Sequence, residues 1–333
     1  MAETDAPGYP DMPVARTRHV NGVRLAVFEA GPEDGPAIVL AHGFPEIAYS
    51  WHAQIPSLAA AGYHVMAPDQ RGYGWSDAPN RVEAYDMAAL TGDLVGLLDA
   101  AGHDRGIFVG HDWGGLVVWQ LPLMHPDRVA GIIGVNTPFI PRLRSDPIVR
   151  MREALGEGMY IVYFQRPDEP EALLGADLDR TFRFFMRVPK DPGGATMPLR
   201  ADNASDFRAA FRAPEETWPG VPLLSAAERA VYVRAYERSG FFGPVSWYRN
   251  FSRNWHLAEG LPQHGGVPAL MITAECDAAL PPSMAEGIER YVPDVEVHCL
   301  EGCGHWTQKE RPEALNALML DWLSRRFPAV AGR

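Results

Sequence analysis

Apolar residues follow two alternating patterns along this chain. Short runs that are apolar throughout indicate buried strands, and segments with apolar residues every three or four positions indicate helices. The alternation predicts parallel β-α-β units, since parallel strands need a crossover connection and are usually covered on both faces. The clearest strand candidates are Ala37–Ala41, Ile107–Gly110, Ile132–Val135 and Ala269–Ile272, with His64–Ala67 a weaker one.

Turn and cap residues mark the ends of other expected elements. Asn21-Gly22 suits the tight turn of an antiparallel hairpin between Arg18–Val20 and Arg24–Glu29. Leucines at helical spacing run from 90 to 98, and Gly102 is placed to end that helix. The sheet is therefore expected to begin with a hairpin and to continue with crossover helices.

The stretch 140–262 departs from this rhythm, because it is rich in Arg, Phe, Tyr, Pro and Met and contains no convincing strand. Its best-marked helix begins with a capping box at Ser225 and ends before Gly240. We interpret the stretch as a helical cap inserted into a core formed by residues 1–139 and 263–333. The predicted fold class is α/β, with a mostly parallel central sheet, helices on both faces and an inserted cap.

Composition and charge narrow the classes of function. Of 333 residues, 47% are hydrophobic and 22% are charged, as in ordinary globular proteins with a sizeable core. The net charge of −12 would repel a phosphate backbone, so no nucleic-acid partner is expected. Three cysteines without a C-x-x-C pair favour a reducing compartment, and no apolar run suits a membrane span or a secretory signal. We therefore expect a cytoplasmic protein without a membrane partner.

One glycine-rich segment carries the strongest chemical signal. The run Gly110-His-Asp-Trp-Gly-Gly115 lies between an apolar strand and a helix, as the nucleophile elbow of a hydrolase does, but its central residue is Asp112 instead of Ser. A carboxylate is already ionised at pH 7 and suits displacement at an sp³ carbon, which forms an alkyl ester with the enzyme. If Asp112 only capped the following helix, three flanking glycines would not be required.

Two further residues follow in the chain order of a catalytic triad, acid and then histidine. Asp277 comes just after the strand candidate Ala269–Ile272, and His305 lies in a glycine-flanked loop. We expect Asp277 to orient the imidazole, which activates water to hydrolyse the ester. Glu275, two residues upstream, is a rival for the acid role.

Hydrolysis of the ester passes through an oxyanion, which needs preorganised donors. We expect these to be the backbone amides of Phe44, in the loop after the first parallel strand, and of Trp113, next to the nucleophile. Pro45 has no amide hydrogen and only shapes the loop. His111 has no second ligand at metal spacing, so we expect no metal and interpret this histidine as packed or hydrogen-bonded beneath the turn.

Several segments together resemble the soluble-type epoxide hydrolases of the α/β-hydrolase fold. The resemblance runs from about residue 15 to 328. It implies conversion of a small apolar epoxide to a vicinal diol with water, no cofactor, and a role in detoxification. The segments that carry it are His42–Glu46, Asp69–Gly74, Gly110–Gly115 and Gly304–Trp306.

The resemblance extends into the cap and implies two proton donors there. Met159–Gln165 resembles the first cap motif of the family and puts Tyr160 in that role, and Ser239–Asn250 resembles the second and gives Tyr248. Phenols can donate to the oxygen of an opening epoxide without prior ionisation. Tyr163 competes with Tyr160, since it lies three residues on and on a similar helix face.

Three questions stay open at this point. The nearest rival function is a haloalkane or haloacid dehalogenase with the same nucleophile, for which Trp113 is one halide donor but Phe44 offers no side-chain amide. Among the cap aromatics, Phe164 and Trp247 are candidates for substrate contact, although aromatic residues at helical spacing more often serve packing. No residue pattern predicts the oligomeric state, and a homodimer is one hypothesis.

Overall fold

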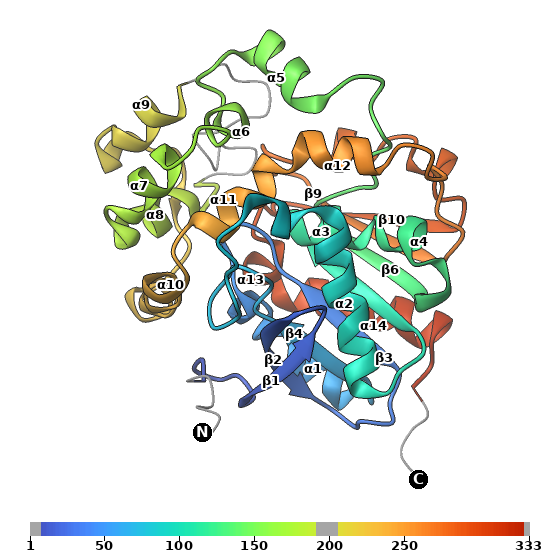
Figure 1. Cartoon of the computed structure of the whole chain (residues 1–333). Helices are drawn as coiled ribbons and strands as arrows, with labels where there is room; N and C mark the ends of the chain where they lie inside the picture. Colours follow the sequence, from blue (N-terminus) through green and yellow to red (C-terminus); the bar gives the residue numbers. More distant parts are fainter. Residues whose placement is uncertain (1–7, 191–205, 330–333) are drawn as a thin grey trace.

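The computed structural model describes residues 8–190 and 206–329, and an eight-stranded sheet forms its centre (Figure 1). The strand order is β1-β2-β4-β3-β5-β6-β9-β10. β2 is antiparallel to both of its neighbours, and the remaining pairs are parallel. The strands are β1 (Ala15–Val20), β2 (Val23–Ala30), β3 (Ala37–Ala41), β4 (His64–Pro68), β5 (Gly106–His111), β6 (Val129–Val135), β9 (Ala269–Ala274) and β10 (Val295–Leu300).

The strands confirm the pattern of apolar runs. Every residue of β3, β4, β5 and β9 is buried, because helices cover the sheet on both faces. The predicted hairpin is also present as β1 and β2. Its turn residues Asn21 and Gly22 have φ values of 45° and 78°, as a type I′ turn requires.

The core helices pack in two groups. α2 contacts α3 and α4, whereas α1 and α13 contact α14. α2 ends at Gly102 in the left-handed conformation, as predicted. The helix after the elbow is interrupted between Val118 and Leu121, just before Pro122, because proline lacks the amide hydrogen that a continuous helix needs. The bounds are α1 (Gln54–Ala60), α2 (Met87–Ala101), α3 (Trp113–Val118), α4 (Leu121–Met124), α13 (Thr307–Glu310) and α14 (Pro312–Arg326).

The chain between β6 and β9 forms the predicted helical insertion. Figure 1 shows α11 and α12 lying between the core helices and the other helices of the insertion. The capping box at Ser225 begins α10, which ends at Gly240 as predicted. The helices are α5 (Pro147–Leu155), α6 (Tyr160–Tyr163), α7 (Glu169–Gly175), α8 (Leu178–Phe185), α9 (Phe207–Arg212), α10 (Ala226–Ser239), α11 (Phe242–Arg249) and α12 (Phe251–Leu257).

One expectation about the insertion was wrong, because it contains a short antiparallel pair. β7 (Arg187–Val188) pairs with β8 (Val221–Pro222) over two residues only. A ladder of this length leaves no alternation of apolar and polar residues to detect. No helix within the described residues is long and apolar enough to cross a membrane.

Candidate active site

Asp112 stands at a sharp turn between β5 and α3. Its φ of 50° lies in a region that residues other than glycine rarely adopt. A Cβ at Gly114 would overlap the carbonyl oxygen of Ala41, and a Cβ at Gly43 would overlap the side chain of Asp112. The hydroxyl of Thr137 donates to the carbonyl oxygen of Asp112 at 2.8 Å. The glycines therefore permit a strained turn that leaves the Asp112 side chain 20% exposed.

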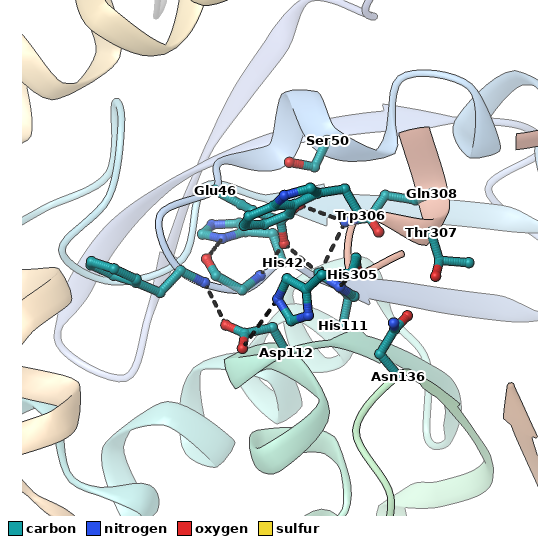
Figure 2. Close-up of polar contacts among 12 residues, drawn as sticks. His42, Glu46, Ser50, His111, Asp112, Asn136, His305, Trp306, Thr307 and Gln308 are labelled. Carbon is teal, nitrogen blue, oxygen red and sulfur yellow. Dashed lines mark hydrogen bonds and ion pairs between the residues drawn. The ribbon is translucent and has the colours of Figure 1, made fainter. Parts of the chain in front are cut away.

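The loops after β9 and β10 bring an acid and a histidine to the same edge of the sheet. Nδ1 of His305 lies 2.8 Å from Oδ2 of Asp277, and Nε2 lies 3.7 Å from Oδ2 of Asp112. Figure 2 shows the imidazole directed toward Asp112. Glu275 accepts a hydrogen bond from the amide of Gly302 at 2.8 Å and is exposed. Of the two acids considered, the geometry pairs Asp277 with His305.

Burial and mutual charge set the protonation of these groups. Burial alone would raise the pKa of Asp277 and lower that of His305, but their opposite charges and hydrogen bond reverse both shifts. The pKa of Asp277 falls to about 2, and that of His305 rises to about 9. The negative charge of Asp112 adds to the rise at His305. Burial raises the pKa of Asp112, against the opposing charges of His305 and His111.

Two backbone amides bond to the carboxylate of the nucleophile. The amide of Phe44 donates to Oδ1 of Asp112 at 2.8 Å. The amide of Trp113 also bonds to this carboxylate and, like that of Phe44, lowers its pKa. The two oxygens therefore differ, because the amide of Phe44 donates to Oδ1 while Oδ2 faces His305. These are the two amides that the sequence predicted as donors to the oxyanion, and that role stays a prediction.

The insertion places two phenols beside the nucleophile. Tyr160 on α6 and Tyr248 on α11 line, together with Asp112, a cavity of about 370 Å³. Their ring centroids are 5.9 Å apart, and the ring of Tyr248 lies 5.0 Å from that of Trp113. Burial, with nearby negative charge, raises the pKa of both phenols above its ordinary value. Both therefore carry their protons at neutral pH.

The other cap aromatics considered from the sequence lie outside the cavity lining. The ring of Tyr163 lies 5.5 Å below the guanidinium of Arg208 and does not line the cavity. Phe164 packs edge-on against Tyr248 at 5.1 Å, and Trp247 is fully buried. Neither is among the lining residues. Of these rings, Phe164 is the one that packs against both phenols.

Sequence reasoning missed Asn136, which directly follows β6. Its Nδ2 donates to Oδ2 of Asp277 at 2.7 Å, the same oxygen that faces His305. Its φ of 63° turns the chain at this point. A polar residue directly after a buried strand was the available signal, because ligand and catalytic groups gather at the carboxyl ends of parallel strands.

A buried carboxylate beneath the site was also missed. Glu46 accepts from the amide of Gly43 at 2.8 Å and from Nε2 of Gln308 at 2.5 Å, and Nδ1 of His111 lies 2.7 Å from it. Nε2 of His111 lies 2.7 Å from the carbonyl oxygen of His305 (Figure 2). The ring of His111 therefore lies between the carboxylate of Glu46 and the backbone of the loop that carries His305. The predicted hydrogen-bonding role of His111 is confirmed, and it ties two loops of the site together.

The walls of the cavity are mostly apolar. Within residues 8–190 and 206–329, no group of three or more His, Cys, Asp or Glu side chains is placed to hold a metal ion. An apolar cavity with a few convergent polar groups is typical of a site for a small organic substrate. The apolar lining includes Leu116, Ile140, Met151, Leu155, Phe251 and Met284.

Known proteins similar to this chain share its fold. The family described as alpha/beta hydrolase fold matches residues 36–312. The chain is 44% identical to "Epoxide hydrolase A" of Mycobacterium tuberculosis (strain ATCC 25618 / H37Rv), over 94% of this chain and 98% of that protein. It is 40% identical to "Bifunctional epoxide hydrolase 2" of Sus scrofa over 91% of its length, and it covers 53% of that longer protein.

The solved structures that resemble this chain include epoxide hydrolases. The crystal structure of Epoxide Hydrolase A from Mycobacterium thermoresistibile superimposes with a TM-score of 0.83 at 43% sequence identity. The match covers 93% of this chain and 98% of that one. The epoxide hydrolase VrEH1 from Vigna radiata also has a TM-score of 0.83, at 30% identity, and the match covers 96% of this chain and 100% of that one.

Proposed function

This chain belongs to the epoxide hydrolases of the α/β-hydrolase fold, and we propose that it converts an epoxide to a vicinal diol through a covalent ester on Asp112. One observation carries the mechanism: an elbow carboxylate, a His–Asp pair and two protonated phenols meet at one site. The reactants are the epoxide and water. The proposed steps use only side chains and amides of this chain.

The first step opens the epoxide. Oδ2 of Asp112 attacks a ring carbon, the bond from that carbon to the ring oxygen breaks, and a phenol of Tyr160 or Tyr248 gives its proton to the departing oxygen. Oδ1 becomes the carbonyl oxygen of the ester and keeps the hydrogen bond from the amide of Phe44. The distinct surroundings of the two carboxylate oxygens support this assignment.

The second step hydrolyses the ester. Nε2 of His305 takes a proton from water, and the hydroxide attacks Cγ of Asp112 while the amides of Phe44 and Trp113 hold the charge that collects on Oδ1. The bond from Cγ to the alkyl oxygen breaks, and the imidazolium returns its proton to that oxygen. The new carboxylic acid then ionises, and its proton restores the phenol.

The charge of Asp112 links the two steps. In the free enzyme this charge helps to raise the pKa of His305. Ester formation removes this charge, so the pKa of His305 falls. The imidazolium can then release its proton to water, and the neutral imidazole serves as the base of the second step. The charge state of Asp112 therefore links formation of the ester to the basicity of His305.

A single turnover with excess enzyme in ¹⁸O-labelled water tests this mechanism. We expect the label in the carboxylate of Asp112 and none in the diol of the first turnover, as read by mass spectrometry of the peptide and the product. Label in the first diol would show direct attack of water on the epoxide and would rule out the ester.

Dehalogenation by the same nucleophile remains the second candidate, but the site favours epoxide opening. Phe44 supplies no halide-binding side chain, and two phenols line the cavity instead. We expect no halide release from a panel of haloalkanes and haloacids. If halide is released, Tyr248→Phe should spare that reaction while it cripples epoxide opening.

Three broader statements belong to the same proposal. We place the domain limits at 1–139, 140–262 and 263–333, since β6 ends at Val135, β9 begins at Ala269 and α5–α12 lie between them. A homodimer in the cytoplasm is our proposal for the assembly and its compartment. Analytical ultracentrifugation and cell fractionation test these two points.

A further inference from the structure

The segment that carries His305 has no regular structure of its own. It is the loop between β10, which ends at Leu300, and α13, which begins at Thr307. The imidazole has to stay between Asp277 at 2.8 Å and Asp112 at 3.7 Å. A displacement of about 1 Å in an active site can lower the rate about 100-fold. Contacts from outside the loop must therefore fix its backbone.

One carboxylate holds this loop on both sides of His305. Oε2 of Glu310 accepts from the amide of Gly304 at 2.7 Å, and Oε1 accepts from the amide of Trp306 at 2.9 Å. Both oxygens of a carboxylate are acceptors, so one side chain can bind two amides. Hydrogen bonds to a charged acceptor are roughly twice as strong as those between neutral groups. Glu310 therefore fixes the amides on either side of His305.

Glycine at position 304 makes this contact possible. A Cβ at Gly304 would lie 2.8 Å from Oε1 of Glu310, a distance that real Cβ atoms essentially never show. Glu310 is the last residue of α13, and its own amide donates to the carbonyl oxygen of Trp306 at 2.8 Å. The end of α13 and the loop before it thus form one hydrogen-bonded unit around His305.

Glu310 also acts on His305 through its charge. Burial raises the pKa of Glu310, although the two amide hydrogen bonds and the positive charge of His305 act in the opposite direction. The interaction is mutual, so the ionised carboxylate favours the imidazolium. Asp277, in contrast, lies within hydrogen-bonding distance of the ring itself. The two acids thus have different tasks: Asp277 orients the ring, and Glu310 holds the backbone that carries it.

We propose that Glu310 is a positioning residue for hydrolysis of the ester. Its carboxylate holds the amides of Gly304 and Trp306, so that Nε2 of His305 stays within reach of the attacking water and of Asp112. The first step uses the nucleophile and the phenols and needs no base, so it does not depend on Glu310. The inference rests on the proposed function and adds a residue to its second step.

The rates of the two steps test the proposal. Glu310→Gln keeps the shape of the side chain, but its amide nitrogen cannot accept, so one of the two loop amides loses its acceptor. Hydrolysis of the ester should slow about tenfold, and the ester should accumulate, whereas its formation should change by less than about twofold. The pKa of His305, followed by NMR titration of the imidazole, should fall because a nearby negative charge is lost. Glu313→Gln is the control, since it removes the same charge from an exposed position on α14 and should change neither the rates nor the titration.

Gly304→Ala tests the same contact from its other side, because the added Cβ displaces the carboxylate of Glu310. This variant should also slow hydrolysis alone, and it decides the case if Glu310→Gln does not fold. The double variant should be no slower than the slower single variant, since both changes remove one contact. Equal losses in both steps, or slower hydrolysis with an unchanged titration of His305, would overturn the proposal. If the wild type forms no ester, the proposed function fails, whereas the titration of His305 in Glu310→Gln still decides whether Glu310 acts on this histidine.

Discussion

The two halves of the site are built in different ways. In the core, Asp112, Asp277 and His305 are charged or become charged, and hydrogen bonds from side chains and amides fix their positions. In the cap, Tyr160 and Tyr248 stay neutral, and Phe164 packs against both rings. The core therefore stabilises charge, whereas the cap delivers protons from an apolar setting. Substitutions in the core should accordingly cost more activity than substitutions in the cap.

Removal of the nucleophile should have the largest effect on activity. Asp112→Ala should lower kcat by about 10⁴–10⁶-fold, as for loss of a covalent nucleophile that acts with its triad. Mass spectrometry of the variant with substrate should show no ester. An unchanged circular dichroism spectrum would confirm the fold. A loss below about 100-fold would show that the core carboxylate is not the nucleophile.

The acid of the triad comes next, and its neighbour serves as a matched control. Asp277→Asn should slow ester hydrolysis by about 10⁴-fold, because the imidazole loses its orienting charge, and the ester should accumulate in a burst. Glu275→Gln should leave the rate within about twofold, since that side chain bonds to the amide of Gly302 away from His305. If the two variants behave in the reverse way, the acid has been misassigned.

Loss of a cap phenol should have a smaller effect. Tyr248→Phe should slow formation of the ester by about 100-fold, the usual contribution of one general acid, and Tyr160→Phe should behave similarly. The measurement is the pre-steady-state rate of ester formation. Tyr163→Phe is the control and should change this rate by less than about twofold, because its ring lies outside the cavity lining. A large effect at Tyr163 would reverse the assignment of the first donor.

Loss of the Asn136 side chain should lower activity less than loss of a phenol, because Asn136 acts through Asp277. A hydrogen bond to a charged group contributes about 1.5–3 kcal/mol, and we expect the low end of this range because Asn136 acts indirectly, so Asn136→Ala should slow ester hydrolysis about tenfold. The pKa of Asp277 should rise and that of His305 should fall, which NMR titration of the imidazole can follow. A slower rate with an unchanged titration would indicate a merely structural role.

The dependence of stability on pH is the mildest test of the charged core. The pKa of His305 is about 9 in the fold against 6.5 for the free group, so its contribution is full below pH 6.5 and is lost as the pH rises through about 9. The pKa of Asp277 is lowered from 3.8 to about 2, so its contribution to stability is full above pH 3.8 and is lost as the pH falls through about 2. Urea unfolding of wild type and His305→Gln should therefore differ most between pH 3.8 and 6.5. A constant difference up to about pH 10 would contradict the pairing.

The sequence was most informative where structure is local. Buried parallel strands are apolar throughout, so Ile107–Gly110 and Ala269–Ile272 could be found from their composition alone. The elbow could be found because close packing against Ala41 and Asp112 demands glycine at fixed positions around it. The two-residue ladder of β7 and β8 could not be found, since it carries no period.

Residues that act through tertiary neighbours were harder to identify. Asn136 meets Asp277 only because β6 lies beside β9, and that adjacency crosses the whole insertion. Glu46 meets His111 because β3 and β5 are neighbours. Strand order decides these contacts, and no short sequence pattern encodes strand order.

The adjacency of β6 and β9 also has a consequence during synthesis. β6 is complete at Val135, but its partner strand begins at Ala269, so the ribosome must add the insertion before the sheet can close. Until then β6 is an open edge with unpaired amides and carbonyls, which other chains can bind. The nascent chain is therefore most exposed to aggregation over this interval, and a chaperone that covers apolar edges should raise the yield of folded protein.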